Sequence, residues 1–264
     1  MGGIKNKVVW ITGASSGIGE ALAYQLNDLG AKTILSARRE TELERVKKNC
    51  KFPENVAVLP LDLAKLAELE TMPKKAISCF DKIDILINNG GISQRSLIKD
   101  TAFKVYQNLI NINYLGAIQL TRCLLPHFTE KKSGHFVTVT SLMGKFSSPY
   151  RSGYCGAKHA LHGFFDALRM EHAKDGILVT LICPGFVQTN VAKNALVGDG
   201  SSSNTEDDAT KNGISPTVCA QKIIAAIIDK KFEVYIGGKE RFGVYLKQFF
   251  PKLLHKLVLN SKVR

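Results

Sequence analysis

Short apolar runs alternate along the chain with longer stretches in which apolar residues recur at helical intervals. The short runs are rich in β-branched residues and predict strands at 8–12, 32–37, 56–61, 83–87, 135–140, 178–183 and 232–236. The longer stretches predict helices at 16–29, 39–49, 65–80, 101–130, 154–174 and 216–229. Strands that alternate with helices form βαβ units around a parallel sheet. The pattern therefore predicts one α/β domain over 1–264, a doubly wound parallel sheet of about seven strands with helices on both faces.

Two segments depart from this alternation. Residues 198–213 are polar and rich in turn residues, so we expect a mobile loop there. Within a C-terminal amphipathic extension at 238–264, the stretch 241–259 is expected to be helical, with Pro251 kinking or dividing it. Lysines 247, 252 and 256 lie between apolar residues expected on one face: Phe242, Leu246, Phe249, Phe250, Leu253, Leu254 and Leu257. Such a basic segment can make peripheral contact with a membrane, pack against a subunit or cover an active site.

Composition narrows the class of protein. The 264 residues carry a formal net charge of +13. The charge indicates either a solvated basic tail or attraction to an anionic cofactor, a membrane surface or nucleic acid, but no nucleic-acid motif accompanies it. Six scattered cysteines form no C-x-x-C pair, and the histidines show no metal-ligand spacing, so we expect neither disulfides nor a metal. The apolar run before Gly13 is too short for a signal peptide, and no run of membrane-spanning length occurs. We expect a soluble cytoplasmic protein without a nucleic-acid partner.

A glycine-rich turn follows the first predicted strand. The sequence TGASSGIG (12–19) places Gly13, Gly17 and Gly19 between a strand and a helix. Glycines let the backbone approach a pyrophosphate there, and the helix N-terminus offers free N–H groups. The alternative is a purely structural turn. The absence of Gly-Lys-Ser/Thr excludes a P-loop.

The end of the second predicted strand indicates the cofactor. Arg38 and Arg39 stand where NAD-binding proteins carry an acidic residue for the ribose 2′-hydroxyl. Guanidinium groups bind a 2′-phosphate instead, which favours NADP(H). Further along, Asp62 and the run NNGG (88–91) follow the third and fourth strands, where a helix cap and a simple turn are the alternatives.

Tyr154 and Lys158 form a candidate catalytic pair. Both lie on the helix predicted from residue 154, and positions i and i+4 share a helix face. The equally spaced Tyr235 and Lys239 are separated by two glycines, which favour a turn. Only the first pair is expected to be held side by side.

Together these motifs resemble the classical short-chain dehydrogenase/reductase family, whose members have a Rossmann fold. The matching parts cover about residues 5–236 and comprise TGASSGIG, Asp62, NNGG, Asn113, Ser141, Tyr154-x-x-x-Lys158 and PGFVQT (184–189). Gly90 departs from the family pattern, which more often has alanine. The run NNGGISQRSL is similar to the dehydrogenase/reductase member 7 group, relatives of the 11β-hydroxysteroid dehydrogenases.

The resemblance implies a catalytic set. Tyr154 would be the general acid in carbonyl reduction and the base in alcohol oxidation, with Lys158 lowering its pKa and holding the nicotinamide ribose. Ser141 would donate a hydrogen bond to the substrate oxygen, or else cap the strand end. Asn113 would position a water that relays protons through Lys158, or else be a buried, hydrogen-bonded helix residue.

The resemblance also implies the residues that bind NADP(H). They are Gly13, Ser15, Ser16, Gly17, Ile18, Gly19, Arg38, Arg39, Asp62, Leu63, Asn88, Asn89, Gly90, Gly91, Tyr154, Lys158, Pro184, Gly185, Val187 and Thr189.

The substrate is expected to be a lipophilic small-molecule ketone, aldehyde or alcohol beneath a lid at 190–215. Its expected contacts are mostly apolar: Ser141, Leu142, Met143, Phe146, Tyr150, Tyr154, Phe186 and Val191. Family members usually form a homodimer or homotetramer, here through 101–130 and 154–174. A 3-oxoacyl-[acyl-carrier-protein] reductase and a cofactor-sensing regulator on the same fold are the alternative functions.

Overall fold

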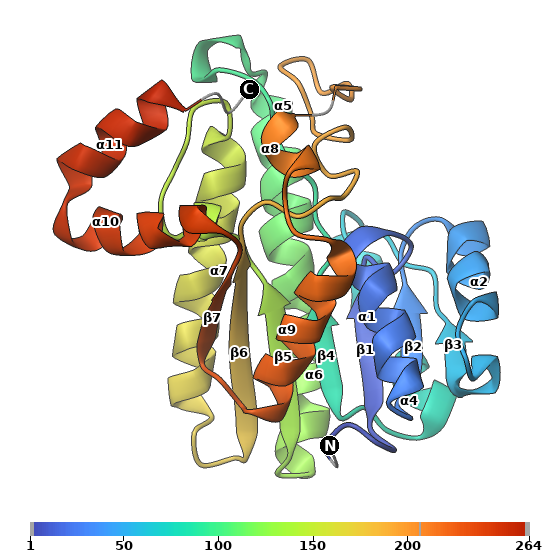
Figure 1. Cartoon of the computed structure of the whole chain (residues 1–264). Helices are drawn as coiled ribbons and strands as arrows, with labels where there is room; N and C mark the ends of the chain where they lie inside the picture. The colour runs from blue at the N-terminus through green and yellow to red at the C-terminus, as the bar shows by residue number, and fades with distance from the viewer. Residues whose placement is uncertain (1–2, 206, 262–264) are drawn as a thin grey trace.

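A parallel sheet of seven strands forms the centre of the computed structural model, which describes residues 3–205 and 207–261 (Figure 1). The strands are β1 (Val8–Thr12), β2 (Lys32–Ser36), β3 (Val56–Val58), β4 (Ile85–Asn88), β5 (Gly134–Val139), β6 (Ile177–Pro184) and β7 (Glu233–Ile236). Their order is β3-β2-β1-β4-β5-β6-β7, and every neighbouring pair is parallel. The order therefore reverses between β1 and β4, where open α/β sheets bind their ligands at the carboxyl ends of the strands.

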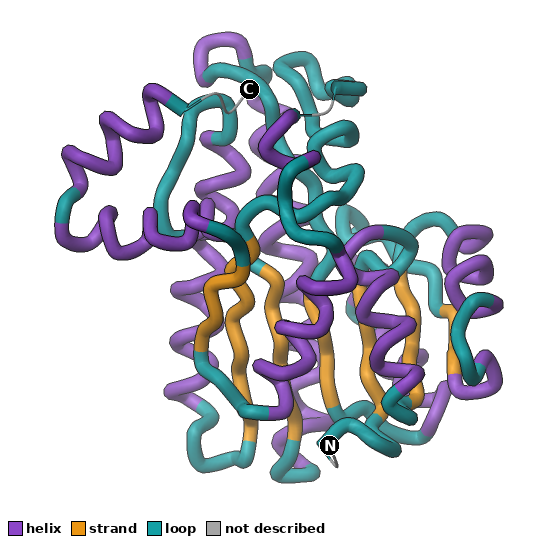
Figure 2. Tube along the Cα trace, in the orientation of Figure 1, coloured by secondary structure: helices purple, strands orange, loops and turns teal. Residues whose placement is uncertain are grey.

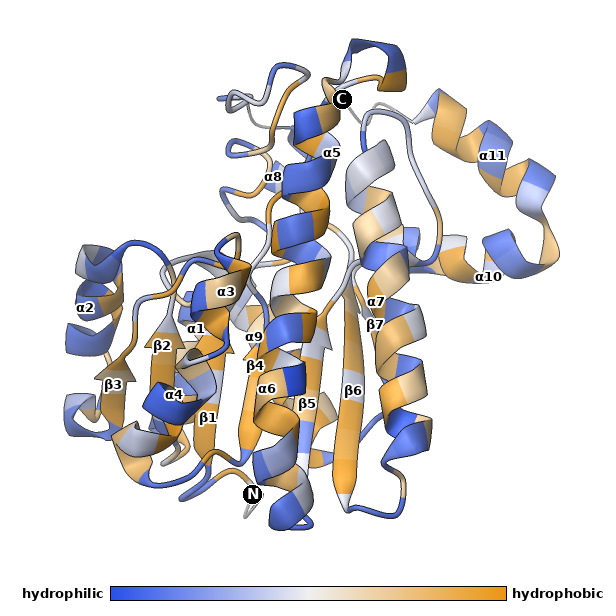
Figure 3. Cartoon of the chain, turned by 180° about the vertical axis from the view of Figure 1, so that it is seen from behind, coloured by the Kyte–Doolittle hydropathy of each residue, from blue (hydrophilic) through white to orange (hydrophobic). Residues whose placement is uncertain are grey.

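Helices cover both faces of the sheet (Figure 2). They are α1 (Gly17–Asp28), α2 (Glu40–Lys48), α3 (Leu66–Leu69), α4 (Met72–Phe80), α5 (Phe103–Ile110), α6 (Gly116–Glu130), α7 (Ser152–Glu171), α8 (Asp208–Lys211), α9 (Pro216–Ile228), α10 (Gly243–Phe249) and α11 (Pro251–Asn260). Apolar side chains of α1, α2 and α9 form the core on one face. Those of α3, α4, α6 and α7 form the core on the other face, which is nearer the viewer in Figure 3. All five residues of β1 are buried, as a strand covered on both faces requires. The predicted doubly wound fold is confirmed.

Two predicted helices differ from the structure. The single helix expected over 65–80 is wrong, because α3 ends at Leu69 and α4 begins at Met72. Pro73 lies in the first turn of α4, where its missing N–H costs no hydrogen bond, whereas in the interior of one continuous helix it would remove a hydrogen bond. The stretch expected over 101–130 is helical, but a π-helical segment, η3 (Asn111–Leu115), separates α5 from α6.

The C-terminal segment forms two helices that project beyond β7 (Figure 1). Pro251 begins α11, so the predicted division at this residue is confirmed. Leu254 is buried with Phe146 in a small apolar cluster, while Phe249 and Phe250 are exposed. The apolar residues therefore do not share one buried face. Contact between the exposed ones and a membrane stays a prediction, and residues 262–264 lie outside the described part.

The segment expected as a lid is fastened to the loop that follows β4. The N–H of Arg95 donates to the carbonyl of Leu196 at 2.8 Å, and the N–H of Ala102 donates to that of Gly198 at 2.8 Å. The short helix α8 lies within the stretch expected to be a mobile loop, whose motion stays a prediction. Residue 206 lies outside the described part. None of the described helices is long and apolar enough to cross a membrane.

Candidate active site

A cavity of about 990 Å³ opens at the carboxyl ends of the strands. Its wall is made of the glycine-rich turn, the ends of β2, β4, β5 and β6, the first turns of α7, the lid and the C-terminal helices. The predicted site residues on this wall are Gly13, Ser15, Ser16, Gly17, Ile18, Arg38, Arg39, Asp62, Leu63, Asn89, Gly90, Gly91, Ser141, Leu142, Met143, Phe146, Tyr154, Lys158, Pro184, Gly185, Phe186, Val187, Thr189 and Val191. Residues spread over most of the chain thus meet at one cavity.

Four predicted residues lie away from this wall: Gly19, Asn88, Asn113 and Tyr150. A Cβ on Gly19 would lie 2.2 Å from the carbonyl oxygen of Gly13, so Gly19 allows α1 to pack against the turn. Asn88 is buried, and its amide donates to Thr121 Oγ1 at 3.0 Å. Tyr150 lines a smaller neighbouring cavity instead.

The glycine-rich turn has the geometry of an anion site. Gly13 has a φ of +65°, and a Cβ there would lie 2.7 Å from Gly90 Cα. Gly17 has a φ of +59° and lies against Thr189, which follows β6. Ser16 is the N-cap of α1, but its side chain makes no capping hydrogen bond. The first N–H groups of α1 are therefore free of a side-chain cap, which fits the pyrophosphate of a dinucleotide.

Gly90 has a local reason to differ from the family pattern. A Cβ at this position would lie 2.6 Å from Leu63 Cδ1, so glycine lets this leucine approach the turn. Thr12 Oγ1 accepts the N–H groups of Asn89 and Gly90, both at 3.0 Å. Asn89 Nδ2 in turn donates to the carbonyl oxygen of Thr12 at 3.0 Å. These bonds lock the end of β4 to the end of β1.

Two arginines and one aspartate line the cavity beyond the ends of β2 and β3. Arg38 and Arg39 are exposed and follow β2, and Arg39 Nη2 donates to Ser15 Oγ at 3.5 Å. Asp62 accepts the N–H of Ala64 at 3.0 Å. The N-cap of α3 is Lys65, so Asp62 does not fill the helix-cap role that was its alternative.

Tyr154 and Lys158 lie together on the first turns of α7. The ammonium of Lys158 is 5.8 Å from the centre of the Tyr154 ring and donates to the carbonyl oxygen of Val139 at 2.8 Å. Burial lowers the pKa of Lys158 to about 8. Burial raises the pKa of Tyr154, and the neighbouring Ser141 hydroxyl acts in the opposite direction.

Ser141 follows β5 and faces the same cavity. Its hydroxyl donates to the carbonyl oxygen of Pro184 at 3.3 Å and accepts the N–H of Met143 at 3.1 Å. It is thereby the N-cap of the short 3₁₀ helix η4 (Leu142–Gly144). The capping role and a place at the cavity wall coexist in this residue.

Asn113 lies in the π-helical segment and is buried. Its Oδ1 accepts the N–H of Ile92, and its Nδ2 donates to the carbonyl oxygen of the same residue, both at 2.8 Å. A Cβ on Gly91 would lie 2.9 Å from Asn113 Oδ1 and 3.7 Å from Lys158 Nζ. The Asn113 side chain therefore fixes the loop that separates it from Lys158.

Sequence reasoning missed several residues at this site. Gln94 is fully buried, and its Oε1 accepts the N–H groups of Gly153 at 2.8 Å and Tyr154 at 3.4 Å. It thus caps the helix that carries the candidate catalytic pair. Arg95 and Arg151 also line the cavity. The partners of these residues are distant in sequence, so no local pattern could have revealed them.

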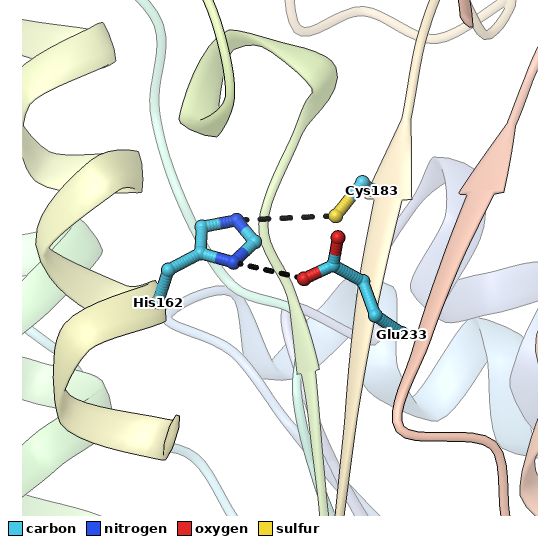
Figure 4. Close-up of side chains that lie close together, drawn as sticks. All are labelled: His162, Cys183 and Glu233. Atoms are coloured by element: carbon cyan, nitrogen blue, oxygen red, sulfur yellow. Dashed lines mark hydrogen bonds and ion pairs between the residues drawn. The ribbon is translucent and has the colours of Figure 1, made fainter. Parts of the chain in front are cut away.

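A cluster of potential metal ligands lies behind the cavity wall: His162, Cys183 and Glu233 (Figure 4). His162 Nε2 is 3.9 Å from Cys183 Sγ, and His162 Nδ1 is 3.4 Å from Glu233 Oε2. Lys145 Nζ is 2.7 Å from the same carboxylate oxygen, and burial raises the pKa of Cys183 to about 12.

Comparisons with known proteins place the chain in a family. The family model described as short chain dehydrogenase matches residues 7–198. Dehydrogenase/reductase SDR family member 7 of Homo sapiens is 46% identical over 255 residues, covering 94% of this chain and 75% of that protein. The member 7B protein of Bos taurus is 36% identical over 265 residues, covering 97% of this chain and 82% of the relative.

Solved structures agree on the fold. A short chain dehydrogenase/reductase from Burkholderia phymatum, solved in complex with NAD, superposes with a TM-score of 0.85 at 22% identity, covering 96% of both chains. A short-chain dehydrogenase from Streptomyces avermitilis gives a TM-score of 0.81 at 26% identity, covering 98% of both. The fold and the strand-end cavity define a Rossmann-like oxidoreductase of the nucleotide-binding type. The chain belongs to the short-chain dehydrogenase/reductase family, and its resemblance to the member 7 group is confirmed.

Proposed function

We propose that the protein is an NADP(H)-dependent oxidoreductase that interconverts a lipophilic carbonyl compound and the corresponding alcohol. One observation carries the proposal. Ser141, Tyr154 and Lys158 share a single cavity wall with the uncapped glycine-rich turn and with Arg38. This arrangement supports a reaction in which Tyr154 transfers a proton beside a bound dinucleotide.

The catalytic roles follow from the chemistry of these side chains. The cofactor, when bound, supplies or accepts the hydride. Tyr154 gives a proton to the substrate oxygen during reduction and takes it back during oxidation. The cation of Lys158 favours the ionised phenol, while burial raises the pKa of Tyr154. The Ser141 hydroxyl turns from the carbonyl oxygen of Pro184 and donates to the substrate oxygen as negative charge develops on it.

Asn113 has a positioning role in this proposal. Both polar atoms of its side-chain amide are bonded to Ile92, so it holds the loop beside Lys158 in place. A relayed water would then be held by the backbone of the π-helical segment rather than by the side-chain oxygen.

The preference for NADP(H) rests on the residues after β2. Arg38 and Arg39 are exposed at the cavity, and the next acidic residue, Glu40, lies outside its wall. Two guanidinium groups match the 2′-phosphate of NADP(H) and offer no acceptor to a ribose 2′-hydroxyl. Ser15 and Asp62 complete this part of the wall.

A lipophilic substrate is supported by the apolar part of the wall. Leu142, Met143 and Phe146 follow β5, and the C-terminal helices add Leu246, Leu254, Leu257 and Val258. The segment 190–215 contributes Asn190, Val191, Asn194, Leu196, Ser202 and Thr210, which supports its role as the lid.

The proposal is tested by following NADPH oxidation with a panel of lipophilic ketones and aldehydes. Tyr154→Phe is expected to lower kcat by about 10²–10⁴-fold, the usual contribution of a general acid. Tyr245→Phe is the control, because Tyr245 is exposed on α10 and outside the cavity wall. Full activity in Tyr154→Phe would remove Tyr154 from the mechanism. Binding of the cofactor without turnover of any carbonyl compound would favour a cofactor-sensing regulator.

A further inference from the structure

An ion cluster of two arginines and one aspartate joins three separate segments beside Tyr154. Arg95 follows β4, Arg151 is the N-cap of α7, and Asp207 is the N-cap of α8 in the lid. Arg95 Nη2 lies 2.6 Å and Arg151 Nη2 lies 3.7 Å from Asp207 Oδ2. The side chains are 12%, 5% and 4% exposed, respectively, so solvent screens this cluster poorly.

The cluster holds more positive than negative charge. Asp207 Oδ1 accepts the N–H of Thr210 at 2.7 Å, which leaves Oδ2 to face both arginines. Within 3–205 and 207–261, Asp207 is the one acidic residue that pairs with either arginine. Two guanidinium groups, which stay charged in proteins, therefore share a single carboxylate.

The two arginines differ in how well they are satisfied. Arg95 Nη1 donates to Ser93 Oγ at 3.0 Å and to the carbonyl oxygen of Gln94 at 2.8 Å. Arg151 Nη1 donates to Ser148 Oγ at 3.0 Å, whereas its buried Nη2 has no hydrogen-bond partner among the described residues. A buried guanidinium with unused donors is costly, so the arrangement calls for another acceptor.

The position of the cluster at the cavity wall indicates that a ligand of the cavity supplies this acceptor. Arg95, Arg151 and Ser148 all line the cavity that holds Tyr154, so a ligand of the cavity can reach this wall. Arg151 precedes Tyr154 by less than one turn of α7, so one ligand of the cavity can contact both residues. The polar residues Ser93, Asn194 and Ser202 continue the wall around it.

We propose that Arg151 and Arg95 form a carboxylate-binding subsite, so that the preferred substrate is a lipophilic oxo or hydroxy acid. This inference rests on the proposed function and narrows its substrate class. The apolar body of the substrate lies against Leu142 and Phe146. Its carboxylate takes the unused donors of Arg151 Nη2, which is buried in the free protein and becomes accessible as Asp207 moves. Asp207 belongs to the lid and contacts the same two guanidinium groups. When the substrate carboxylate binds, Asp207 loses part of its contact with them.

The experiment compares acids with their neutral esters. The probes are aryl ketones that end in a carboxylate on alkyl chains of increasing length, each paired with its methyl ester. Binding to the full chain is measured by calorimetry with NADP⁺ present. At the best chain length the acid is expected to bind at least about tenfold more tightly than its ester, since charge-assisted hydrogen bonds to arginine are strong.

Variants of Arg151 test whether the preference for acid over ester comes from the proposed carboxylate-binding subsite. Arg151→Gln is expected to reduce the acid-to-ester ratio to about twofold or less, and Arg151→Lys to keep part of it. Arg122→Gln is the control, because Arg122 is exposed on α6 and outside the cavity wall. Equal binding of acid and ester by the wild-type protein at every length would overturn the inference, and this comparison needs no variant to fold. A preference that survives in Arg151→Gln would overturn it as well.

Turnover separates this inference from the proposed function. If the acids bind preferentially but neither acids nor esters are reduced with NADPH or NADH, the proposed function fails while the subsite stands. If esters and acids are reduced with equal kcat/KM and bind equally, the subsite fails while the proposed function stands.

Discussion

The ammonium nitrogen of Lys158 lies 5.8 Å from the centre of the Tyr154 ring and donates a hydrogen bond to the carbonyl oxygen of Val139 at 2.8 Å. The cation is thereby fixed between the helix that carries the phenol and the end of a core strand. Lys158 is 5% exposed, so the folded protein keeps a charged group out of water beside the group whose ionisation it favours.

The first prediction concerns the effect of this buried lysine on stability. Burial lowers the pKa of Lys158 to about 8 in the folded protein, below the value of about 10.4 in an unfolded chain. Between these values Lys158 binds more protons in the unfolded state, so its own contribution to the stability of the wild-type protein rises with pH. The Lys158→Met variant lacks the group that titrates, so it does not gain stability from this source as the pH rises. Its Tm relative to wild type is expected to be highest below pH 8 and to fall as the pH rises toward about 10.4.

Thermal unfolding at several pH values checks this. A difference in Tm between Lys158→Met and wild type that stays constant from about pH 7 to about pH 10 would contradict the lowered pKa. The variant is also expected to lose turnover, because Tyr154 then lacks the neighbouring cation.

A second prediction compares a glycine in crowded surroundings, Gly19, with a glycine beside open space, Gly163. Gly19→Ala would place a Cβ 2.2 Å from the carbonyl oxygen of Gly13, and backbone cannot yield as a side chain can. It is expected to lower the free energy of unfolding by about 1–3 kcal/mol and to weaken NADPH binding. Gly163 lies inside α7, and a Cβ added there would meet no described atom within 4 Å beyond its own stretch of helix. Gly163→Ala is expected to stabilise the protein by about 0.5–1 kcal/mol.

Denaturant unfolding and cofactor titration of Gly19→Ala and Gly163→Ala test the two expected changes in stability and the expected change in NADPH affinity. Equal stability of the two variants would show that the turn tolerates a methyl group at residue 19, and the account of its packing would then be wrong.

A third prediction concerns Gln94, which caps α7. Gln94→Met removes the acceptor of the Gly153 and Tyr154 N–H groups and leaves buried donors unsatisfied. The free energy of unfolding is expected to fall by about 1–3 kcal/mol. Because these groups fix the start of the catalytic helix, kcat is expected to fall more than the affinity for NADPH. Gln119→Met on the exposed surface of α6 is the control, and an identical response of the two variants would argue against the capping role.

Much of the fold could be predicted from the sequence, because a strand buried on both faces needs a continuous apolar run. All seven strands were predicted, and only their ends shifted, as at β3, which stops at Val58. The break between α3 and α4 was missed although Pro73 signals it. The π-helical segment around Asn113 has no such signal, because its sequence NINYL contains neither proline nor glycine.

The candidate site could also be predicted from the sequence only in part. Tyr154 and Lys158 are neighbours on one helix, so their spacing alone brings them together. Arg95 and Asp207 are 112 residues apart, and only the folded lid makes them partners. Asn88 belongs to a motif for the cofactor turn, yet the pleat of β4 directs it into the core, where it bonds Thr121.

The most direct test of the central claim is calorimetric titration of the protein with NADPH and with NADH, repeated with Arg38→Ala. We expect NADPH to bind at least about tenfold more tightly than NADH, since a guanidinium–phosphate contact is a strong charge-assisted bond. Arg38→Ala should bring the affinity for NADPH down toward that for NADH and leave NADH unchanged, whereas Arg122→Ala should alter neither. Equal binding of the two cofactors by the wild-type protein, or an Arg38→Ala variant that still prefers NADPH, would contradict the central claim.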